Sequence, residues 1–111
     1  MPQDVFSHHV DAVSRADMTA ILADYAPDAV LLTSQGALEG HSGVEAFFRQ
    51  ASAALGTFEL SVTGTVFGGD ALLAHWTASS PTGRIDDGID SFVFVDGRIQ
   101  VQTSSFTIQA V

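Results

Sequence analysis

The chain has 111 residues, of which 46% are hydrophobic and 15% are charged, a size and balance typical of one packed domain over residues 1–111. Its net charge is −9 and its four basic residues are scattered Arg, so the sequence lacks the basic patch that nucleic acids or anionic membranes require. The chain contains no Cys, which excludes disulfides and thiolate metal sites, and the absence of a signal-peptide pattern or a long apolar run leads us to expect a cytoplasmic protein.

Two helices are predicted at the N-terminus. Apolar residues recur at spacings of three and four over residues 4–14, which indicates an amphipathic helix. Asp17 is placed to cap a second, shorter helix that continues through Tyr25. This helix must end before Pro27, because the residue that precedes a proline is pushed out of the α region.

A buried strand over residues 29–33 and a third helix come next. Ser42 and Glu45 form the pattern of a capping box, and the apolar residues after them keep helical spacing. We therefore expect this helix to run to residue 55 and to end at Gly56.

Four antiparallel strands are predicted after the third helix. The period of the apolar residues changes to two over residues 58–62, and turn residues separate this strand from the next, over residues 71–79. Asp96 and Gly97 then stand between two apolar strands, which is the strongest hairpin signal in the chain. Helices early and an antiparallel meander late predict an α+β fold with the helices on one face of the sheet.

Residues 90–95 are apolar on both faces of their predicted strand. Phe92 and Phe94 alternate with Val93 and Val95, so both faces need to be covered. The helices supply one cover. Since the chain has no further helix, we expect the other cover to be a second copy of the protein, in a homodimer.

The order of several short blocks resembles the SnoaL-like branch of the nuclear transport factor 2-like superfamily, which includes ketosteroid isomerases and polyketide cyclases. The blocks that carry the resemblance are Ala16-Asp17, Tyr25-Ala-Pro-Asp-Ala-Val30, Leu38-Glu-Gly40 with Phe47-Phe48, and Asp90-Ser-Phe-Val-Phe-Val-Asp-Gly-Arg-Ile99. The resemblance implies a cone-shaped α+β fold in which three helices pack on a curved antiparallel sheet around a pocket. The fold hosts many reactions and some plain binders, so it does not by itself fix the chemistry.

The resemblance to ketosteroid isomerases implies roles for three residues. Asp90 takes the place of the protonated Asp that hydrogen-bonds the enolate oxygen, and His9 stands roughly where those enzymes have a Tyr. Thr33 occupies the position of the carboxylate base. Because a hydroxyl cannot act as that base, the usual steroid isomerisation is not expected.

Asp90 and His9 are the candidate catalytic residues, and each has a structural alternative. Asp90 shares a face with Phe92 and Phe94, where burial would raise its pKa; alternatively it belongs to the polar turn at residues 86–88 and lies at the rim. His9 lies on the apolar stripe of the first helix, either as a core histidine held by a backbone carbonyl or as the partner of Asp90 in an acid/base pair.

The remaining candidates would line a ligand pocket. Trp76 is placed inside, as the resemblance implies, which turns its neighbour His75 to the outer face. Phe92 and Phe94 supply apolar wall, and Thr33 faces the ligand. Tyr25 is most simply a core residue whose hydroxyl reaches the pocket as a lesser possibility.

Two functions of different classes are compatible with these residues. The first is an isomerase, cyclase or dehydratase that uses Asp90 and His9 to move a proton on a hydrophobic carbonyl compound. The second is a non-catalytic module that binds a small apolar ligand or dimerises. No histidines with metal-ligand spacing share a face with a carboxylate, and no phosphate-binding glycine loop is present, so neither a metal nor another cofactor is expected.

Overall fold

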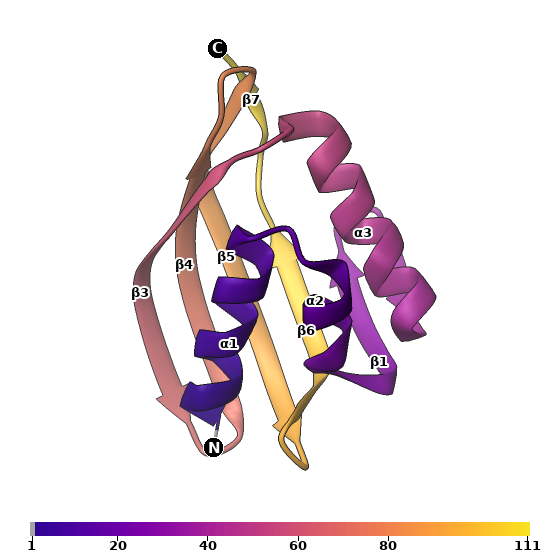
Figure 1. Cartoon of the computed structure of the whole chain (residues 1–111). Helices are drawn as coiled ribbons and strands as arrows, with labels where there is room; N and C mark the ends of the chain where they lie inside the picture. Colours follow the sequence, from indigo (N-terminus) through magenta and orange to yellow (C-terminus); the bar gives the residue numbers. More distant parts are fainter. Residues whose placement is uncertain (1) are drawn as a thin grey trace.

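The computed structural model of the chain describes residues 2–111 as three helices on one side of a strongly curved sheet (Figure 1). The helices are α1 (Pro2–Ser14), α2 (Met18–Ala23) and α3 (Gly40–Leu55). The strands are β1 (Tyr25–Thr33), β2 (Gly36–Glu39), β3 (Glu59–Gly68), β4 (Ala71–Ser79), β5 (Gly83–Val95), β6 (Arg98–Ser105) and β7 (Gln109–Ala110).

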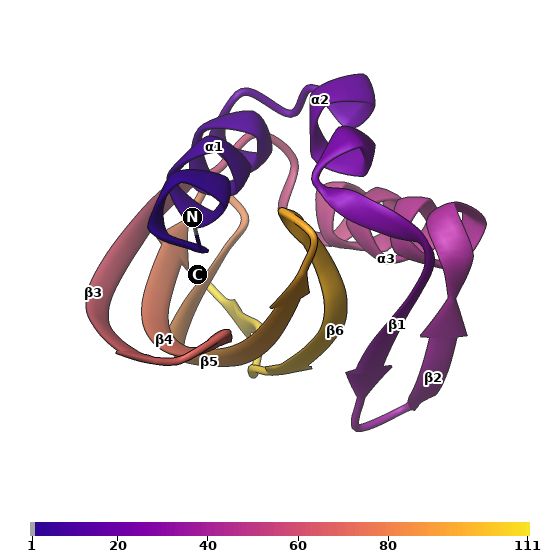
Figure 2. The same ribbon diagram turned by 90° about the horizontal axis from the view of Figure 1, so that it is seen from below.

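The sheet has the strand order β2-β1-β6-β5-β4-β3, and the short β7 pairs with the start of β5. All neighbours are antiparallel except β1 and β6, which run parallel. Figure 2 shows that β3 to β6 bend round as an open trough, with α1 across its mouth and α3 beside β1 and β2. The predicted α+β fold, with N-terminal helices on a curved antiparallel sheet, is confirmed.

The second helix is shorter than the sequence predicted. It ends at Ala23, and Tyr25 is the first residue of β1, so placing Tyr25 in the helix was wrong. The backbone N–H of Ile99 donates to the carbonyl of Asp24 at 2.7 Å, which ties the chain to β6 directly after the helix. Pro27 lies where the β1–β6 register shifts, an irregularity that tolerates its missing N–H.

The third helix begins earlier than the predicted capping box. Its N-cap is Glu39, which makes no side-chain capping bond, and Ser42 lies inside the first turn. The strand β2 was not predicted; it ends at Glu39, and Gly40, with φ +68°, turns the chain straight into the helix. The end of the helix at Gly56, with φ +69°, is as expected.

The β5–β6 hairpin turns at the predicted dipeptide. Asp96 and Gly97 have φ of 52° and 75°, the positive values that a tight two-residue hairpin turn requires. The antiparallel meander of β3 to β6 is also confirmed. Along β4, Trp76 faces the helices and His75 is exposed on the outer face.

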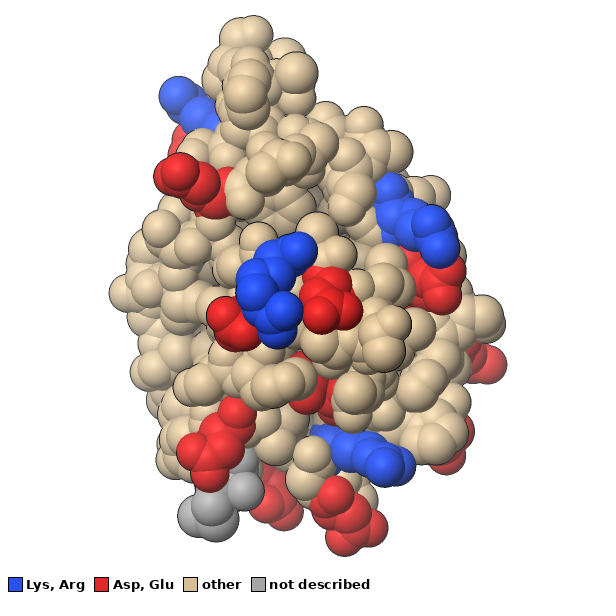
Figure 3. All heavy atoms as spheres, viewed as in Figure 1, with Lys and Arg blue, Asp and Glu red and all other residues tan. Residues whose placement is uncertain are grey.

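Three of the four Arg side chains form ion pairs with neighbouring acids, and Figure 3 shows basic and acidic side chains side by side on this face. The ion pairs of Arg are Arg15 with Asp11 and Asp17, Arg49 with Glu45, and Arg84 with Asp86. In the described part of the chain, no helix combines the length and hydrophobicity that a membrane span needs.

A close contact sets the height of α3 above the β1–β2 hairpin. A Cβ added to Gly43 would lie 2.9 Å from the carbonyl carbon of Leu38. Gly43→Ala should therefore lower the free energy of unfolding by about 1–3 kcal/mol, although alanine in a helix ordinarily adds about 0.5–1 kcal/mol. Urea denaturation measures this change.

Gly68→Ala is the control, because no atom lies within 4 Å of the Cβ it would add. A Gly43→Ala variant as stable as the wild type would show that α3 does not rest on Leu38 in this way.

Candidate functional site

A cavity of about 80 Å³, here called the inner cavity, lies between the concave face of the sheet and helices α1 and α3. Most of its wall is aliphatic or aromatic, and its polar side chains are few. The lining residues are Phe6, His9, Val10, Val13, Phe47, Phe48, Ala51, Leu55, Phe58, Leu60, Val62, Ala74, Trp76, Ala78, Ile85, Asp90, Phe92, Gln102, Ser104 and Phe106.

Asp90 is the only carboxylate in this wall, and three side chains donate hydrogen bonds to it. Trp76 Nε1 and Ser104 Oγ donate to Oδ1 at 3.0 and 2.8 Å, and Gln102 Nε2 donates to Oδ2 at 2.8 Å. Asp90 is 9% exposed and is therefore a buried wall residue. The polar turn predicted at residues 86–88 was wrong, because these residues lie inside strand β5. A carboxylate accepts about four hydrogen bonds, so these three donors leave one acceptor position of Asp90 unfilled.

The strand register brings these donors to Asp90. Ser104 on β6 pairs directly with Asp90, and Trp76 on β4 pairs with Gly88, two residues before Asp90. The indole lies against Gly88 so closely that a Cβ there would be 2.3 Å from the ring. A glycine at this position is therefore what lets the indole lie over β5 and reach the carboxylate.

Burial and hydrogen bonding act in opposite directions on Asp90. Burial raises the pKa of its carboxyl above the usual value, because the charged form loses solvation. The hydrogen bonds from Ser104, Trp76 and Gln102 stabilise the charged form and pull the pKa back, without cancelling the effect of burial. Asp90 is thus more basic than an exposed Asp, and its ionised form is stabilised by hydrogen bonds.

Tyr25 belongs to this network but not to the wall. Its hydroxyl donates to Gln102 Oε1, and burial, with Asp90 and Asp24 nearby, raises the pKa of the hydroxyl well above its usual value. The phenol therefore stays protonated and holds the Gln102 amide with its NH₂ group toward Asp90. Tyr25 is a core residue, as predicted, but its hydroxyl does not line the inner cavity and acts on Asp90 through Gln102.

His9 lies in the wall formed by α1. It is 5% exposed and packs edge-on against Tyr25, Phe48 and Phe92, at ring-centroid distances of 5.6, 6.0 and 5.7 Å. Burial, and then the neighbouring His8, lower its pKa to about 4, so the imidazole is neutral at pH 7. Its Nδ1 is buried without a hydrogen-bond partner among the described residues, so it is not held by a backbone carbonyl.

The predicted contact between His9 and Asp90 is not formed. Both residues line the inner cavity, but the hydrogen bonds of Asp90 go to Trp76, Gln102 and Ser104. The hypothesis of a directly bonded acid/base pair is therefore wrong for this structure. The side chains of His9 and Asp90 instead line the same, mostly apolar cavity without bonding to each other.

Two of the predicted ligand-binding residues lie elsewhere. Phe94 stacks behind Phe92 at 5.9 Å in the core and does not line the inner cavity. Thr33 is at the end of β1, where its hydroxyl bonds the turn to β2, and it lines a separate groove outside the cavity. Leu32 pairs with Thr103, which places Thr33 level with Ser104 and Asp90, but strand β6 lies between β1 and the strand that holds Asp90.

Two residues of the site were not predicted. Gln102 and Ser104 hold Asp90 from β6, but the sequence shows them only as polar residues in a strand with alternating burial. In the described residues, no group of three or more His, Asp or Glu side chains is arranged to hold a metal ion.

Three comparisons place the chain among known proteins. Residues 6–102 match the family described as SnoaL-like domain. No curated protein sequence matches the chain. Many solved structures share its fold, at sequence identities that support a common fold and nothing finer.

One similar structure is a candidate polyketide cyclase from Sinorhizobium meliloti, with a TM-score of 0.80 and 24% identity over 91% of this chain and 93% of the other. A second is a candidate ketosteroid isomerase from Kribbella flavida, with a TM-score of 0.80 and 17% identity over 96% and 77%. A third is IdmH, a candidate polyketide cyclase from Streptomyces antibioticus, with a TM-score of 0.78 and 17% identity over 94% and 90%.

The family match covers most of the chain, and the TM-scores show that the similar structures share its fold. The protein belongs to the SnoaL-like domain family, within the nuclear transport factor 2-like fold.

Proposed function

We propose that this protein binds a small neutral carbonyl compound in the inner cavity and moves a proton on it, with Asp90 as the acid/base group. The observation that carries the proposal is a single buried carboxylate, oriented by three donors, in an otherwise apolar wall. Such a wall selects a neutral, largely apolar ligand, and the net charge of −9 disfavours an anionic one.

The proton transfer uses the free acceptor position of Asp90. The ionised carboxylate takes a proton from the carbon beside the carbonyl, and the electron pair of that C–H bond forms the enolate. Asp90 then returns the proton to the same carbon or to another one. The raised pKa strengthens the base, and the three donors fix its orientation and stabilise its ionised form.

His9 is proposed as the hydrogen-bond donor to the carbonyl oxygen. It is neutral above about pH 4, so one of its ring nitrogens carries a proton. A neutral imidazole can stabilise a developing enolate oxygen without bringing a buried charge. Its lack of a partner among the described side chains supports this role, because a ligand would supply the missing hydrogen bond.

A non-catalytic binder is the second candidate. The separation of His9 from Asp90 and the position of Thr33 outside the inner cavity favour it, since no second carboxylate lines the cavity. In this alternative Asp90 only anchors the ligand and ties β4 to β6. The two candidates differ in one measurable property, which is proton exchange on the bound ligand.

Asp90→Asn separates the two candidates. With 2-butanone in D₂O, the wild type should accelerate deuterium uptake beside the carbonyl, and the variant should lose about 100-fold or more of that rate, as for loss of a general base. The exchange, followed by NMR, should rise with pH through the Asp90 pKa, which lies above 3.8, because the ionised form is the base.

Asp86→Asn is the matched control, since Asp86 is an exposed residue of the same strand that pairs with Arg84. Deuterium uptake that is equal in the wild type and in Asp90→Asn, while ligand binding persists, would leave only the binder.

Trp76→Phe tests the orientation of the base. Phenylalanine keeps an aromatic wall but removes the N–H that donates to Asp90 Oδ1. Because the charged form loses a donor, the pKa of Asp90 should rise and the midpoint of the pH profile of exchange should move to higher pH. A midpoint that stays in place would show that the indole does not stabilise the carboxylate.

We also propose that two copies of the chain associate through the outer face of the sheet. Val66, Leu73, Val93 and Val95 project from β3, β4 and β5 with exposed fractions of 64, 38, 40 and 45%. Val66 and Leu73 are direct cross-strand neighbours, so the residues form a strip rather than isolated positions. A continuous apolar strip on a sheet is best covered by its own copy about a two-fold axis.

Val93→Glu should convert the dimer to a monomer, because it places two like charges in the middle of the contact. Light scattering at micromolar concentration measures the mass. Val111→Glu is the control, since Val111 is exposed at the C-terminus away from the strip. A wild-type protein that is monomeric under these conditions would contradict the proposed interface.

A further inference from the structure

The inner cavity is too small for a complete ring compound. A cavity of about 150 Å³ lined by aliphatic and aromatic side chains is known to accept benzene, and this one has about 80 Å³. Only a few non-hydrogen atoms of a ligand fit beside Asp90 without rearrangement of the wall. A larger carbonyl compound must therefore extend out of the inner cavity.

A second hollow, here called the outer groove, begins where the inner cavity ends. It has about 460 Å³ and lies between the β1–β2 turn, α3 and residues 104–108. Phe47, Ala51, Ser104 and Phe106 line both hollows, so one set of side chains forms the boundary between them.

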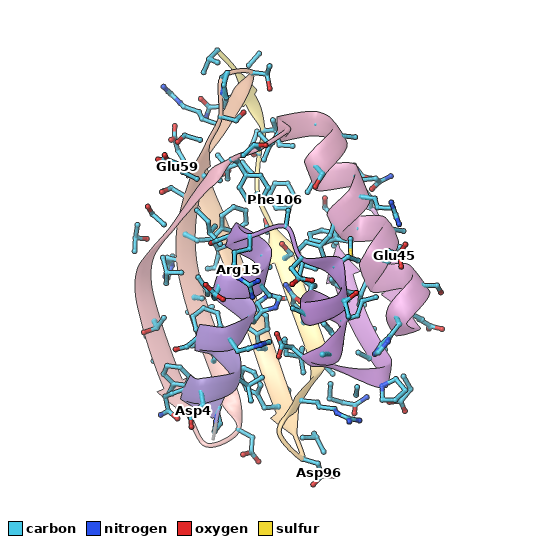
Figure 4. All side chains as sticks on the ribbon, viewed as in Figure 1. Asp4, Arg15, Glu45, Glu59, Asp96 and Phe106 are labelled. Atoms are coloured by element: carbon cyan, nitrogen blue, oxygen red, sulfur yellow. The ribbon has the colours of Figure 1, made fainter. Side chains whose placement is uncertain are left out.

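The boundary is an aromatic pair on separate elements. The rings of Phe47 on α3 and Phe106 are 6.2 Å apart at 75°, and Phe106 also contacts Trp76 at 5.5 Å. Phe106 follows the last residue of β6, in a segment without strand pairing, on the helix-covered side of the sheet (Figure 4). Both phenylalanines are half-buried and neither takes part in strand pairing, so moving their side chains apart would break no hydrogen bond of the sheet.

The outer groove differs from the inner cavity in its chemistry. Thr33, Ser34, Gln35 and Gln50 supply hydroxyl and amide groups beside apolar surface from α3 and Ile108. The inner cavity, in contrast, has Asp90 and its donors as its main polar feature. The two hollows therefore suit different parts of one ligand.

We propose that the ligand is elongated, with its carbonyl end beside Asp90 and its remaining length passing between Phe47 and Phe106 into the outer groove. This inference rests on the proposed function, since it takes Asp90 as the group that meets the carbonyl. The substrate class is a neutral carbonyl compound with an extended chain or flat tail that carries hydrogen-bonding groups at its far end. Thr33 thus contacts the ligand's tail and has no part in the proton transfer.

Methyl ketones of increasing length, from 2-butanone to 2-undecanone, test this arrangement. Trp76 is the only tryptophan and lies in the wall, so its fluorescence reports binding. Affinity should rise about three- to fourfold per methylene once the chain enters the outer groove, as expected for burial of apolar surface. A terminal hydroxyl on the longest ketone should be tolerated, because it meets Thr33, Gln35 or Gln50.

Two helix variants form a matched pair. Ala54→Phe fills the outer groove, whereas Ala53→Phe lies one residue away on α3 and lines neither hollow. Long ketones should bind Ala54→Phe at least tenfold more weakly than Ala53→Phe, while 2-butanone should bind both equally. Gln50→Phe, a second exposed position in the groove, should repeat the effect if Ala54→Phe folds poorly.

The outcomes separate this inference from the proposed function. Short ketones that bind in an Asp90-dependent way, with affinity independent of length, overturn the elongated ligand alone. Equal binding of long ketones to Ala54→Phe and Ala53→Phe does the same. If no ketone of any length binds, both the elongated ligand and the carbonyl function of Asp90 are overturned.

Discussion

The structure depends on how the buried carboxylate of Asp90 is held. Its donors come from β4 and β6, the two strands on either side of β5, so a single side chain ties three strands together across the concave face. An ionised group in an apolar wall is destabilising unless it is hydrogen-bonded, and here the bonds also fix its orientation. Removal of any donor therefore affects both the stability of the sheet and the basicity of the one acidic group in the cavity.

The same apolar surroundings act on His9 in the opposite sense. Burial raises the pKa of Asp90 but lowers that of His9, because each group loses solvation in its charged form. The site thus combines a carboxyl group of raised pKa with an imidazole that is uncharged at neutral pH. The free energy of unfolding should depend on the lowered pKa of His9, since His9 is protonated more readily in the unfolded chain. Its contribution is present above about pH 6.5 and is lost as the pH falls toward about 4.

The shape of the site limits the ligand more than its polarity does. The inner cavity admits only the reacting end of a molecule, and the outer groove begins at the shared aromatic boundary of Phe47 and Phe106. Neighbouring positions on helix α3 therefore border different hollows. Ala51 borders both hollows, Ala54 borders the groove alone, and Ala53 borders neither. Helix α3 thus sets the width of the passage between the two hollows. The distance of this helix from the sheet depends on the close approach of Gly43 to β2.

The sequence by itself determined the fold class, the first and third helices in outline and the β5–β6 turn, because periodicity and turn chemistry are local properties. For Asp90 it left two positions open, one buried and one at the rim, and the structure decided for the buried one. The partners of Asp90 were decided by tertiary structure. Counted from the turn, an uninterrupted hairpin would pair Asp90 with Thr103, but a register shift between Val93 and Phe94 brings Ser104 opposite instead. A one-residue shift exchanges the two faces of a strand, and no local pattern in the sequence records it.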